Sequence, residues 1–155
     1  MLTLKENLLL AAERLGLAVD DALPASCLLD GLYIGGKGRP LILMKPSLPD
    51  SAYVPVLAEE MGHHITSHGV AVELEDISRV KSENYGRAWA VELLLPVCKF
   101  VFATVLLGCE EAADYAEAFS LNESFVRDAI AYHRRKNAWP GGFGAIYRLP
   151  AAAAL

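Results

Sequence analysis

The sequence predicts an α+β fold that is mostly helical and contains one small β-hairpin. Its 155 residues are 54% hydrophobic and 21% charged, which is typical of a globular chain with a sizeable core and not of a disordered one. Several long stretches have the apolar spacing or the capping residues of helices. Two short apolar runs, Gly31–Gly36 and Pro40–Met44, flank a Gly-Lys-Gly turn, which is the signal of a hairpin.

Residues 1–137 are expected to form one domain, whose C-terminal helical part covers about residues 97–137. Residues 138–155 contain Pro-Gly-Gly and an alanine-rich end, and are expected to form a flexible tail. The helices are expected at Leu4–Leu15, from a cap at Asp50 or Ser51 through Ile65, and at Arg79–Leu95, Val97–Gly108, Glu110–Phe119 and Glu123–Lys136. The last two, with Asn122 as N-cap between them, suggest a helix-turn-helix shape.

The composition also limits the kind of protein and its compartment. A formal net charge of −5 argues against a broad nucleic-acid-binding surface. The three cysteines have no metal-ligand spacing and are interpreted as free thiols in a reducing compartment. The N-terminus has no signal-peptide cleavage site, and the apolar run Leu93–Leu107 is too short to span a membrane. A cytoplasmic protein without a membrane partner is therefore expected.

One stretch, Leu57–His68 (LAEEMGHHITSH), has an unusual density of metal-capable side chains. Glu59 and His63 are four residues apart, so a helix places them on one face, one turn apart. The zinc-peptidase helix H-E-x-x-H has this geometry: its outer residues bind the metal and its inner Glu polarises a water molecule. Glu60 occupies the inner position here, and the first His is replaced by Glu59.

This short motif has other interpretations. Glu is common on helix faces, so Glu59 to His63 would also fit a solvated acidic face. A second pair, His64 and His68, has the same spacing, but Ile65, Thr66 and Gly69 indicate that the helix ends there. Gly62 is costly within a helix, and it would allow a neighbouring backbone to approach closely.

Beyond this stretch, the sequence resembles the ImmA/IrrE family of metallopeptidases, in particular a branch of phages and mobile elements in which Glu-Glu often replaces His-Glu. The second helix of that family has the pattern E-x-x-A-x-x-[FW]-A-x-x-L-L-x-P. The resemblance covers roughly residues 30–137 and rests mainly on the two paired helices. The four matching pieces are Asp30–Ile34 (DGLYI), Leu57–Ser67 (LAEEMGHHITS), Glu83–Pro96 (ENYGRAWAVELLLP) and Leu121–Tyr132 (LNESFVRDAIAY).

The resemblance implies a zincin-like fold in which Glu83 supplies the third metal ligand beside Glu59 and His63. Glu92 is a competing acid on the same helix, but it lies nine residues from Glu83 and hence on the opposite side. Gly86 departs from the pattern, which usually has Ala there, at a cost of about 1 kcal/mol in helix propensity.

The expected cofactor is Zn²⁺, with Glu60 as the general base of peptide hydrolysis. Two carboxylates and one imidazole would neutralise the charge of Zn²⁺, which weakens it as a Lewis acid and shifts the preference towards harder metals such as Mn²⁺. The resemblance implies a protein substrate, a helix-turn-helix repressor of a phage or mobile element, cut at a specific peptide bond.

Substrate binding is expected at the strand after the hairpin turn, interpreted as an edge strand that could pair with an extended peptide. A hairpin that only covers the core is the alternative. The residues of this strand are Leu41, Ile42, Leu43 and Met44.

Three other functions remain open from the sequence. The first is a regulator that keeps the peptidase fold, has lost the metal and binds a partner protein. The second is a DNA-binding protein using residues 110–136, although base-reading side chains are sparse there. The third is a cysteine hydrolase, although Cys98 and Cys109 lie in apolar sequence surroundings where a thiol is usually inert.

Overall fold

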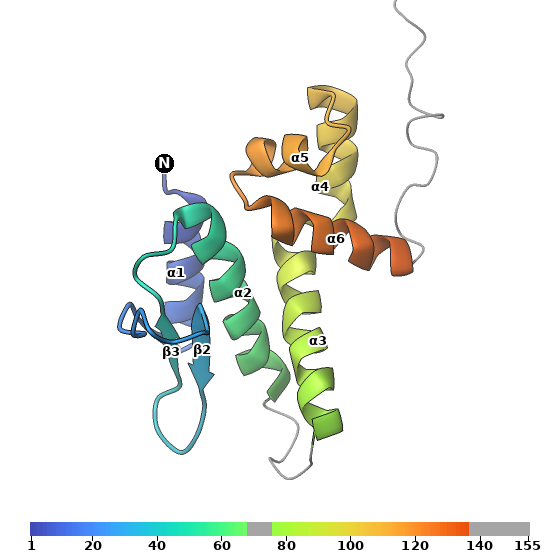
Figure 1. The fold of residues 1–155 in the computed structure, drawn as a ribbon. Helices are drawn as coiled ribbons and strands as arrows, with labels where there is room; N and C mark the ends of the chain where they lie inside the picture. Colours follow the sequence, from blue (N-terminus) through green and yellow to red (C-terminus); the bar gives the residue numbers. More distant parts are fainter. Residues whose placement is uncertain (68–75, 137–155) are drawn as a thin grey trace, which may run out of the picture. The chain divides into compact units, whose positions relative to one another are not determined.

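A computed structural model of the chain describes residues 1–67 and 76–136 (Figure 1). It shows an α+β protein with a small three-stranded sheet, in agreement with the predicted class. The predicted tail, residues 138–155, lies outside the described residues. The elements are α1 (Leu4–Arg14), β1 (Ala18–Asp20), β2 (Gly31–Ile34), β3 (Leu41–Met44), α2 (Asp50–Ser67), α3 (Asp76–Leu94), α4 (Val97–Phe102), the π-helical segment η1 (Ala103–Leu107), α5 (Ala112–Phe119) and α6 (Glu123–Arg135).

The chain divides into two compact units, Met1–Leu94 and Leu95–Leu155. The sequence predicts one domain with a helical part from about residue 97, and the structure separates that helical part as a unit of its own. The first unit contains the sheet and all the candidate site residues. Its core is made of Leu8, Ala12, Leu17, Leu23, Ile42, Met44, Tyr53, Val54, Leu57, Ala58, Met61, Ala90, Val91 and Leu94.

The sheet has the strand order β1-β3-β2. The predicted hairpin is confirmed, since β2 and β3 pair antiparallel with Tyr33 opposite Ile42. The strand β1 was not predicted, because three residues are too few to show an alternating pattern. It pairs parallel with β3, with Val19 opposite Ile42.

This topology corrects the prediction for the substrate-binding strand. Leu41, Ile42, Leu43 and Met44 form the central strand and not an edge strand, because β1 pairs with one side of β3 and β2 with the other. The backbone groups of β3 are therefore used on both sides and cannot receive a peptide. The free edges of the sheet belong to β1 and β2.

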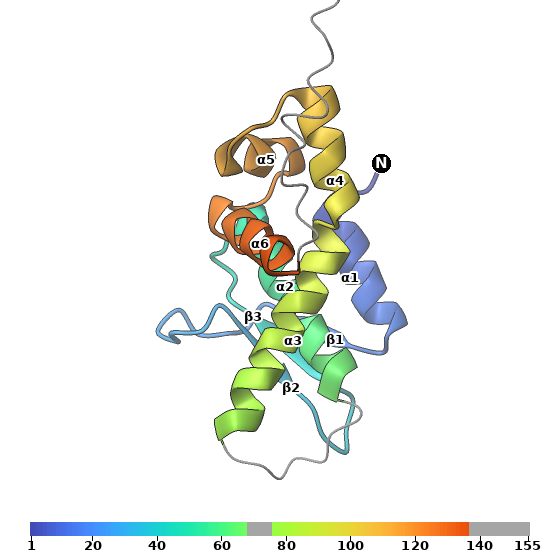
Figure 2. The same cartoon turned by 90° about the vertical axis from the view of Figure 1, so that its right-hand side faces the viewer.

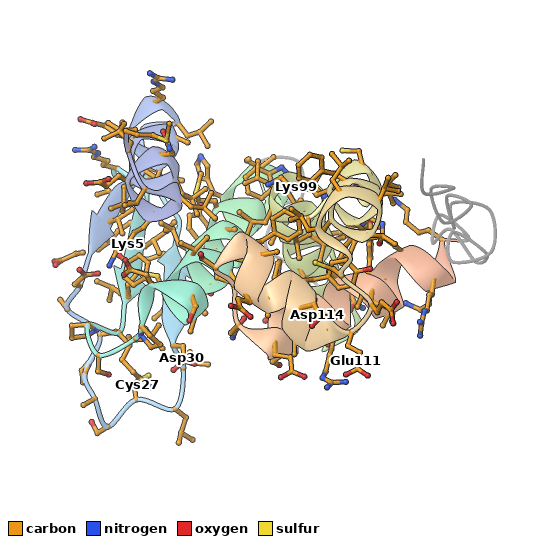
Figure 3. All side chains as sticks on the ribbon, turned by 90° about the horizontal axis from the view of Figure 1, so that it is seen from above. Lys5, Cys27, Asp30, Lys99, Glu111 and Asp114 are labelled. Atoms are coloured by element: carbon orange, nitrogen blue, oxygen red, sulfur yellow. The ribbon has the colours of Figure 1, made fainter. Side chains whose placement is uncertain are left out.

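The helices of the first unit pack around α2. Figures 1 and 2 show α2 and α3 side by side and running in opposite directions. The helix α1 begins with a capping box, in which the Thr3 side chain accepts from the Glu6 N–H and the Glu6 carboxylate accepts from the Thr3 N–H. Lys5 of this helix, labelled in Figure 3, forms an ion pair with Asp50 at 2.9 Å and lies over the Tyr53 ring. The sequence predicts Asp50 as a possible cap of α2, but in the structure it is the first residue of this helix.

The second unit contains the predicted helix-turn-helix. The helices α5 and α6 pack against each other, and Asn122 is the N-cap of α6, although its side chain makes no capping hydrogen bond. The predicted helix Val97–Gly108 changes to π-helical geometry at Ala103 and ends at Gly108, whose φ of 70° is left-handed. His133, which the sequence places in a basic helix end, is instead buried, with Nε2 2.8 Å from the Leu95 carbonyl oxygen.

Within residues 1–67 and 76–136, no single helix is both long and apolar enough to cross a membrane. One bent pair, Glu83–Leu94 with Val97–Leu107, meets the criterion of length and composition only when its two segments are taken together.

The capping box at the start of α5 leads to a prediction about the stability of the second unit. Glu111 and Asp114, labelled in Figure 3, form a capping box, and the Asp114 carboxylate also accepts from the Glu110 N–H at 2.9 Å. The backbone hydrogen bonds from Glu111 and Glu110 lower the pKa of Asp114. Its ionised form therefore stabilises the fold at neutral pH, and this contribution is lost as the pH falls through the lowered pKa.

We expect Asp114→Asn to lower the melting temperature at pH 7, and the difference from the wild type to shrink in acid. Thermal unfolding followed by circular dichroism between about pH 7 and pH 2 measures both. Glu117→Gln, a change at an exposed acid of the same helix, is the control. A difference that stays constant over this pH range would contradict the assignment.

Candidate functional site

The site is built on a close crossing of α2 and α3 at two glycines. A Cβ added to Gly62 would lie 2.6 Å from the carbonyl oxygen of Gly86 and 2.9 Å from its Cα. A Cβ added to Gly86 would lie 2.8 Å from Cε1 of His63 and 3.1 Å from the carbonyl oxygen of Glu59. The close approach predicted for Gly62 is therefore confirmed. Gly86 stands where the pattern quoted above usually has Ala, and the crossing leaves no room for the Cβ of an alanine there.

The crossing brings together two of the predicted metal ligands. Nε2 of His63 on α2 lies 3.9 Å from Oε2 of Glu83 on α3. The His63 ring lies against the Gly86 backbone, and its side chain is 15% exposed. The Glu83 side chain is 70% exposed and therefore has freedom to move towards or away from the imidazole.

The third predicted ligand, Glu59, has a cationic neighbour. Its Oε1 lies 3.3 Å from Nε of Arg87, which follows Glu83 by one turn of α3. The Glu59 side chain is 24% exposed and the Arg87 side chain 55% exposed. The two helices thus make two side-chain contacts, His63 with Glu83 and Glu59 with Arg87, on either side of the glycine crossing.

The predicted general base, Glu60, contacts the sheet. Its Oε2 accepts a hydrogen bond of 2.8 Å from the backbone N–H of Tyr33 in β2. The pKa of Glu60 is raised to about 7, mainly by burial and to a smaller extent by the nearby carboxylates of Glu59 and Glu83, while the hydrogen bond from the Tyr33 N–H opposes the shift. A carboxyl group with this pKa can both accept and release a proton near neutral pH, as general acid–base catalysis requires.

Two further contacts fix β2 against α2. The hydroxyl of Tyr33 is 2.9 Å from Nδ1 of His64, which lies one turn after Glu60. A Cβ at Gly31 would lie 2.6 Å from Cγ1 of Val56, so only glycine allows the strand this close to the helix. His64 is buried and contacts this tyrosine, and His68 lies outside the described residues. The contact between His64 and Tyr33 favours a structural role for His64.

The donor chemistry of these residues fits a divalent metal, and the geometry fits in part. Ligand atoms of a tetrahedral zinc are roughly 3.3–3.6 Å apart when each bond is about 2.0–2.2 Å. The 3.9 Å between His63 and Glu83 is therefore within a small side-chain adjustment. In the described part of the chain, however, no three metal-capable side chains converge on one point. The third ligand would have to turn away from Arg87.

Some of these neighbours were not found from the sequence. Arg87 lies at a variable position of the helix pattern, and only its spacing of four from Glu83 could have indicated it. Tyr33 belongs to a quoted motif, but its two contacts with α2 join residues 27 and 31 positions apart. The competing acid, Glu92, is exposed on α3.

Cys98 and Cys109 are the thiols that the cysteine-hydrolase alternative would use. Burial raises the pKa of the Cys109 thiol, so that it stays protonated and is a poor nucleophile. Cys98 is exposed, and not in the apolar surroundings that the sequence indicates. Both belong to the second unit, whereas the cluster belongs to the first.

Comparison with known proteins gives no match, whether with family models, with curated proteins or with solved structures.

The glycine crossing leads to a stability prediction. Gly62→Ala is expected to destabilise the protein by about 1–3 kcal/mol, the usual cost of overpacking, although Ala is favoured over Gly by about 1 kcal/mol in a helix. Chemical denaturation of the purified protein measures the change. Gly38→Ala is the matched control, since an added Cβ there meets nothing within 4 Å. A Gly62→Ala protein as stable as the wild type would show that the helices do not cross this closely.

The raised pKa of Glu60 leads to a second prediction. Its folded-state pKa of about 7 lies above the ordinary 4.5, so the ionised carboxylate destabilises the fold above about pH 7, and this penalty disappears below 4.5. In chelator-treated protein, Glu60→Gln should increase the free energy of unfolding by about 1–2 kcal/mol at pH 8, after allowance for partial exposure. It should have little effect near pH 4.

Urea denaturation of both proteins at the two pH values measures this difference. Glu13→Gln, at an exposed acid of α1, is the control and should change stability little at either pH. An equal effect of Glu60→Gln at pH 8 and pH 4 would mean that burial does not penalise its charge.

Proposed function

We propose that the protein is a metal-dependent endopeptidase with a zincin-like site. The observation that carries this proposal is the approach of His63 to Glu83, at 3.9 Å across two helices, beside a partly buried carboxyl group with a pKa of about 7. These are the residues that the ImmA/IrrE resemblance assigns to the metal and to the general base. Their contacts within the fold thus support an assignment made from sequence motifs alone.

In this proposal Glu59, His63 and Glu83 hold one divalent metal, Zn²⁺ or Mn²⁺. When bound, the metal supplies positive charge that polarises a peptide carbonyl and makes water more acidic. Glu60 accepts the proton from the attacking water and passes it to the leaving nitrogen. Because the Tyr33 N–H donates to Oε2 of Glu60, Oε1 is the oxygen left to carry that proton.

The peptide backbone would bind along the outer edge of β2. The N–H of Tyr33 points to Glu60 and not to β3, so the backbone groups of Tyr33 and, two residues earlier, Gly31 are turned to this edge. Because Glu60 already accepts from the Tyr33 N–H, a peptide would pair with the other outward-facing backbone groups. An extended peptide added antiparallel or parallel to β2 would therefore lie directly beside the Glu60 carboxylate. This edge takes the role that the sequence assigned to β3.

The substrate class rests on the resemblance alone. Members of that family often act on a helix-turn-helix repressor of the same mobile element, so we propose such a repressor, cut at one site, as the substrate. No direct contact with nucleic acid and no membrane partner is part of the proposal, and the proposed location is the cytoplasm.

A second function is favoured by one observation. The Arg87 guanidinium pairs with Glu59, as expected of a fold in which Glu59 has a structural role and which binds a partner protein without catalysis. In that case the cluster of Glu59, His63, Glu83 and Arg87 would only join α2 to α3. Metal content distinguishes the two functions.

Metal analysis is the first test. Protein purified without chelator, or reloaded with Zn²⁺ or Mn²⁺, is expected to hold close to one equivalent by elemental analysis, and His63→Ala and Glu83→Gln to lose it. Glu92→Gln, the same change at the other acid of α3, is the control and should retain the metal. An absence of metal after reloading would favour the partner-binding function.

Cleavage is the second test. Glu60→Gln should retain the metal but lose cleavage of a repressor encoded beside the gene, with a decrease of at least about 100-fold expected for removal of a general base. Gel electrophoresis and mass spectrometry of the repressor measure the cleavage. Activity of Glu60→Gln equal to that of the wild type would remove Glu60 from this role.

A further inference from the structure

Arg87 is the one element of the cluster that neither the sequence motif nor the proposed chemistry uses. Its Nε lies 3.3 Å from Oε1 of Glu59, one of the two carboxylate oxygens that could bind a metal. It belongs to the same helix as Glu83 and follows it by one turn, so it projects from the same side of α3. A carboxylate oxygen paired with a guanidinium cannot at the same time give its full charge to a metal ion.

We propose that Arg87 is a resident counter-ion of the site, which competes with the divalent metal for Glu59 and thereby sets the metal affinity. This inference rests on the proposed function, since it requires that Glu59 is a ligand. It assigns to Arg87 the role of a positioning residue. In the metal-free protein the guanidinium holds Glu59 between the helices, and in the metal-bound protein Glu59 turns from Arg87 to the metal.

The charges of the cluster explain why such a counter-ion is needed. Glu59, Glu60 and Glu83 lie close enough together that the first and last raise the pKa of the middle one. Neighbouring carboxylates repel one another when no cation lies between them. One arginine beside Glu59 reduces this repulsion and allows the helices to cross at the glycines before any metal has bound.

The exposed fractions of the Arg87 and Glu59 side chains allow Glu59 to turn from Arg87 to a metal. The Arg87 side chain is 55% exposed, so it can return to water without being trapped inside the protein as an unpaired charge. Glu59 is less exposed, at 24%, and stays at the crossing. An ion pair of this kind is weak and is screened by salt, so it can be displaced by a dication and still reduce the affinity measurably.

The test is metal affinity, measured without any substrate. Arg87→Met keeps an unbranched side chain of similar helix propensity and removes the guanidinium and its charge. We expect the full-length variant to bind Zn²⁺ about tenfold more tightly than the wild type, because a competing ion pair and a repulsive charge are both removed. Competition with a chromophoric chelator measures Zn²⁺, and the electron paramagnetic resonance signal of the free ion measures Mn²⁺.

Two controls separate competition from a structural effect. Arg127→Met removes an arginine that is ion-paired with Glu123 in α6, and it should leave metal affinity unchanged. Arg87→Lys keeps the charge and should bind close to the wild type. The difference between the wild type and Arg87→Met should also narrow as the salt concentration rises from about 0.05 M to 1 M, since salt screens the exposed pair.

The outcomes also distinguish this inference from the proposed function. Tighter binding by Arg87→Met that is lost in Arg87→Met/His63→Ala supports it, even if the wild type holds little metal. Equal or weaker binding by Arg87→Met, with metal still bound by the wild type, overturns the inference and leaves the metal site in place. No metal in either protein overturns both.

Discussion

The close contact between the backbones of α2 and α3 is the constraint on which the site depends. With glycine on both sides, at Gly62 and Gly86, the carbonyl oxygen of one helix lies where a side chain of the other would begin. At this close crossing the His63 ring lies against the Gly86 backbone, and its Nε2 comes within 3.9 Å of Oε2 of Glu83. Ridges of larger side chains would separate the helix axes by about 8–10 Å, which would increase the distance between these two side chains.

A second glycine contact acts on the opposite side of α2. Gly31 allows β2 to approach Val56, and the Tyr33 backbone then reaches the Glu60 carboxylate. The successive acids Glu59 and Glu60 therefore face different neighbours: α3 with its arginine for the first, and the sheet for the second. The difference in their surroundings follows from the helix, because adjacent residues point about 100° apart. The two roles that we propose, ligand for Glu59 and base for Glu60, would thus fall to carboxyl groups in different surroundings.

The helices and the spacing within α2 could be predicted from the sequence, because both follow from local periodicity. The role of β3 could not. The interpretation of Leu41–Met44 as an edge strand failed because β1 has only three residues and pairs in parallel with a strand more than twenty residues later. Arg87 was missed for a related reason: its partner, Glu59, is 28 positions away and on another helix. Contacts between distant residues carry no local signal unless a motif already names them.

The net charge of the side chains around Glu59 affects both the stability of the fold and the reaction proposed for the site. Two carboxylates and one imidazole would cancel the charge of a bound dication, which makes it a weaker Lewis acid than a site with two imidazoles. Arg87 lies within ion-pair distance of Glu59 and adds one positive charge there, so a metal-bound cluster need not be neutral overall. If the guanidinium remains near after Glu59 turns away, it can stabilise the negative charge that develops on a peptide carbonyl oxygen. A residue that weakens metal binding would then strengthen the reaction at the metal. In the proposed site, Glu59 and Arg87 would therefore act together as one pair of opposite charges.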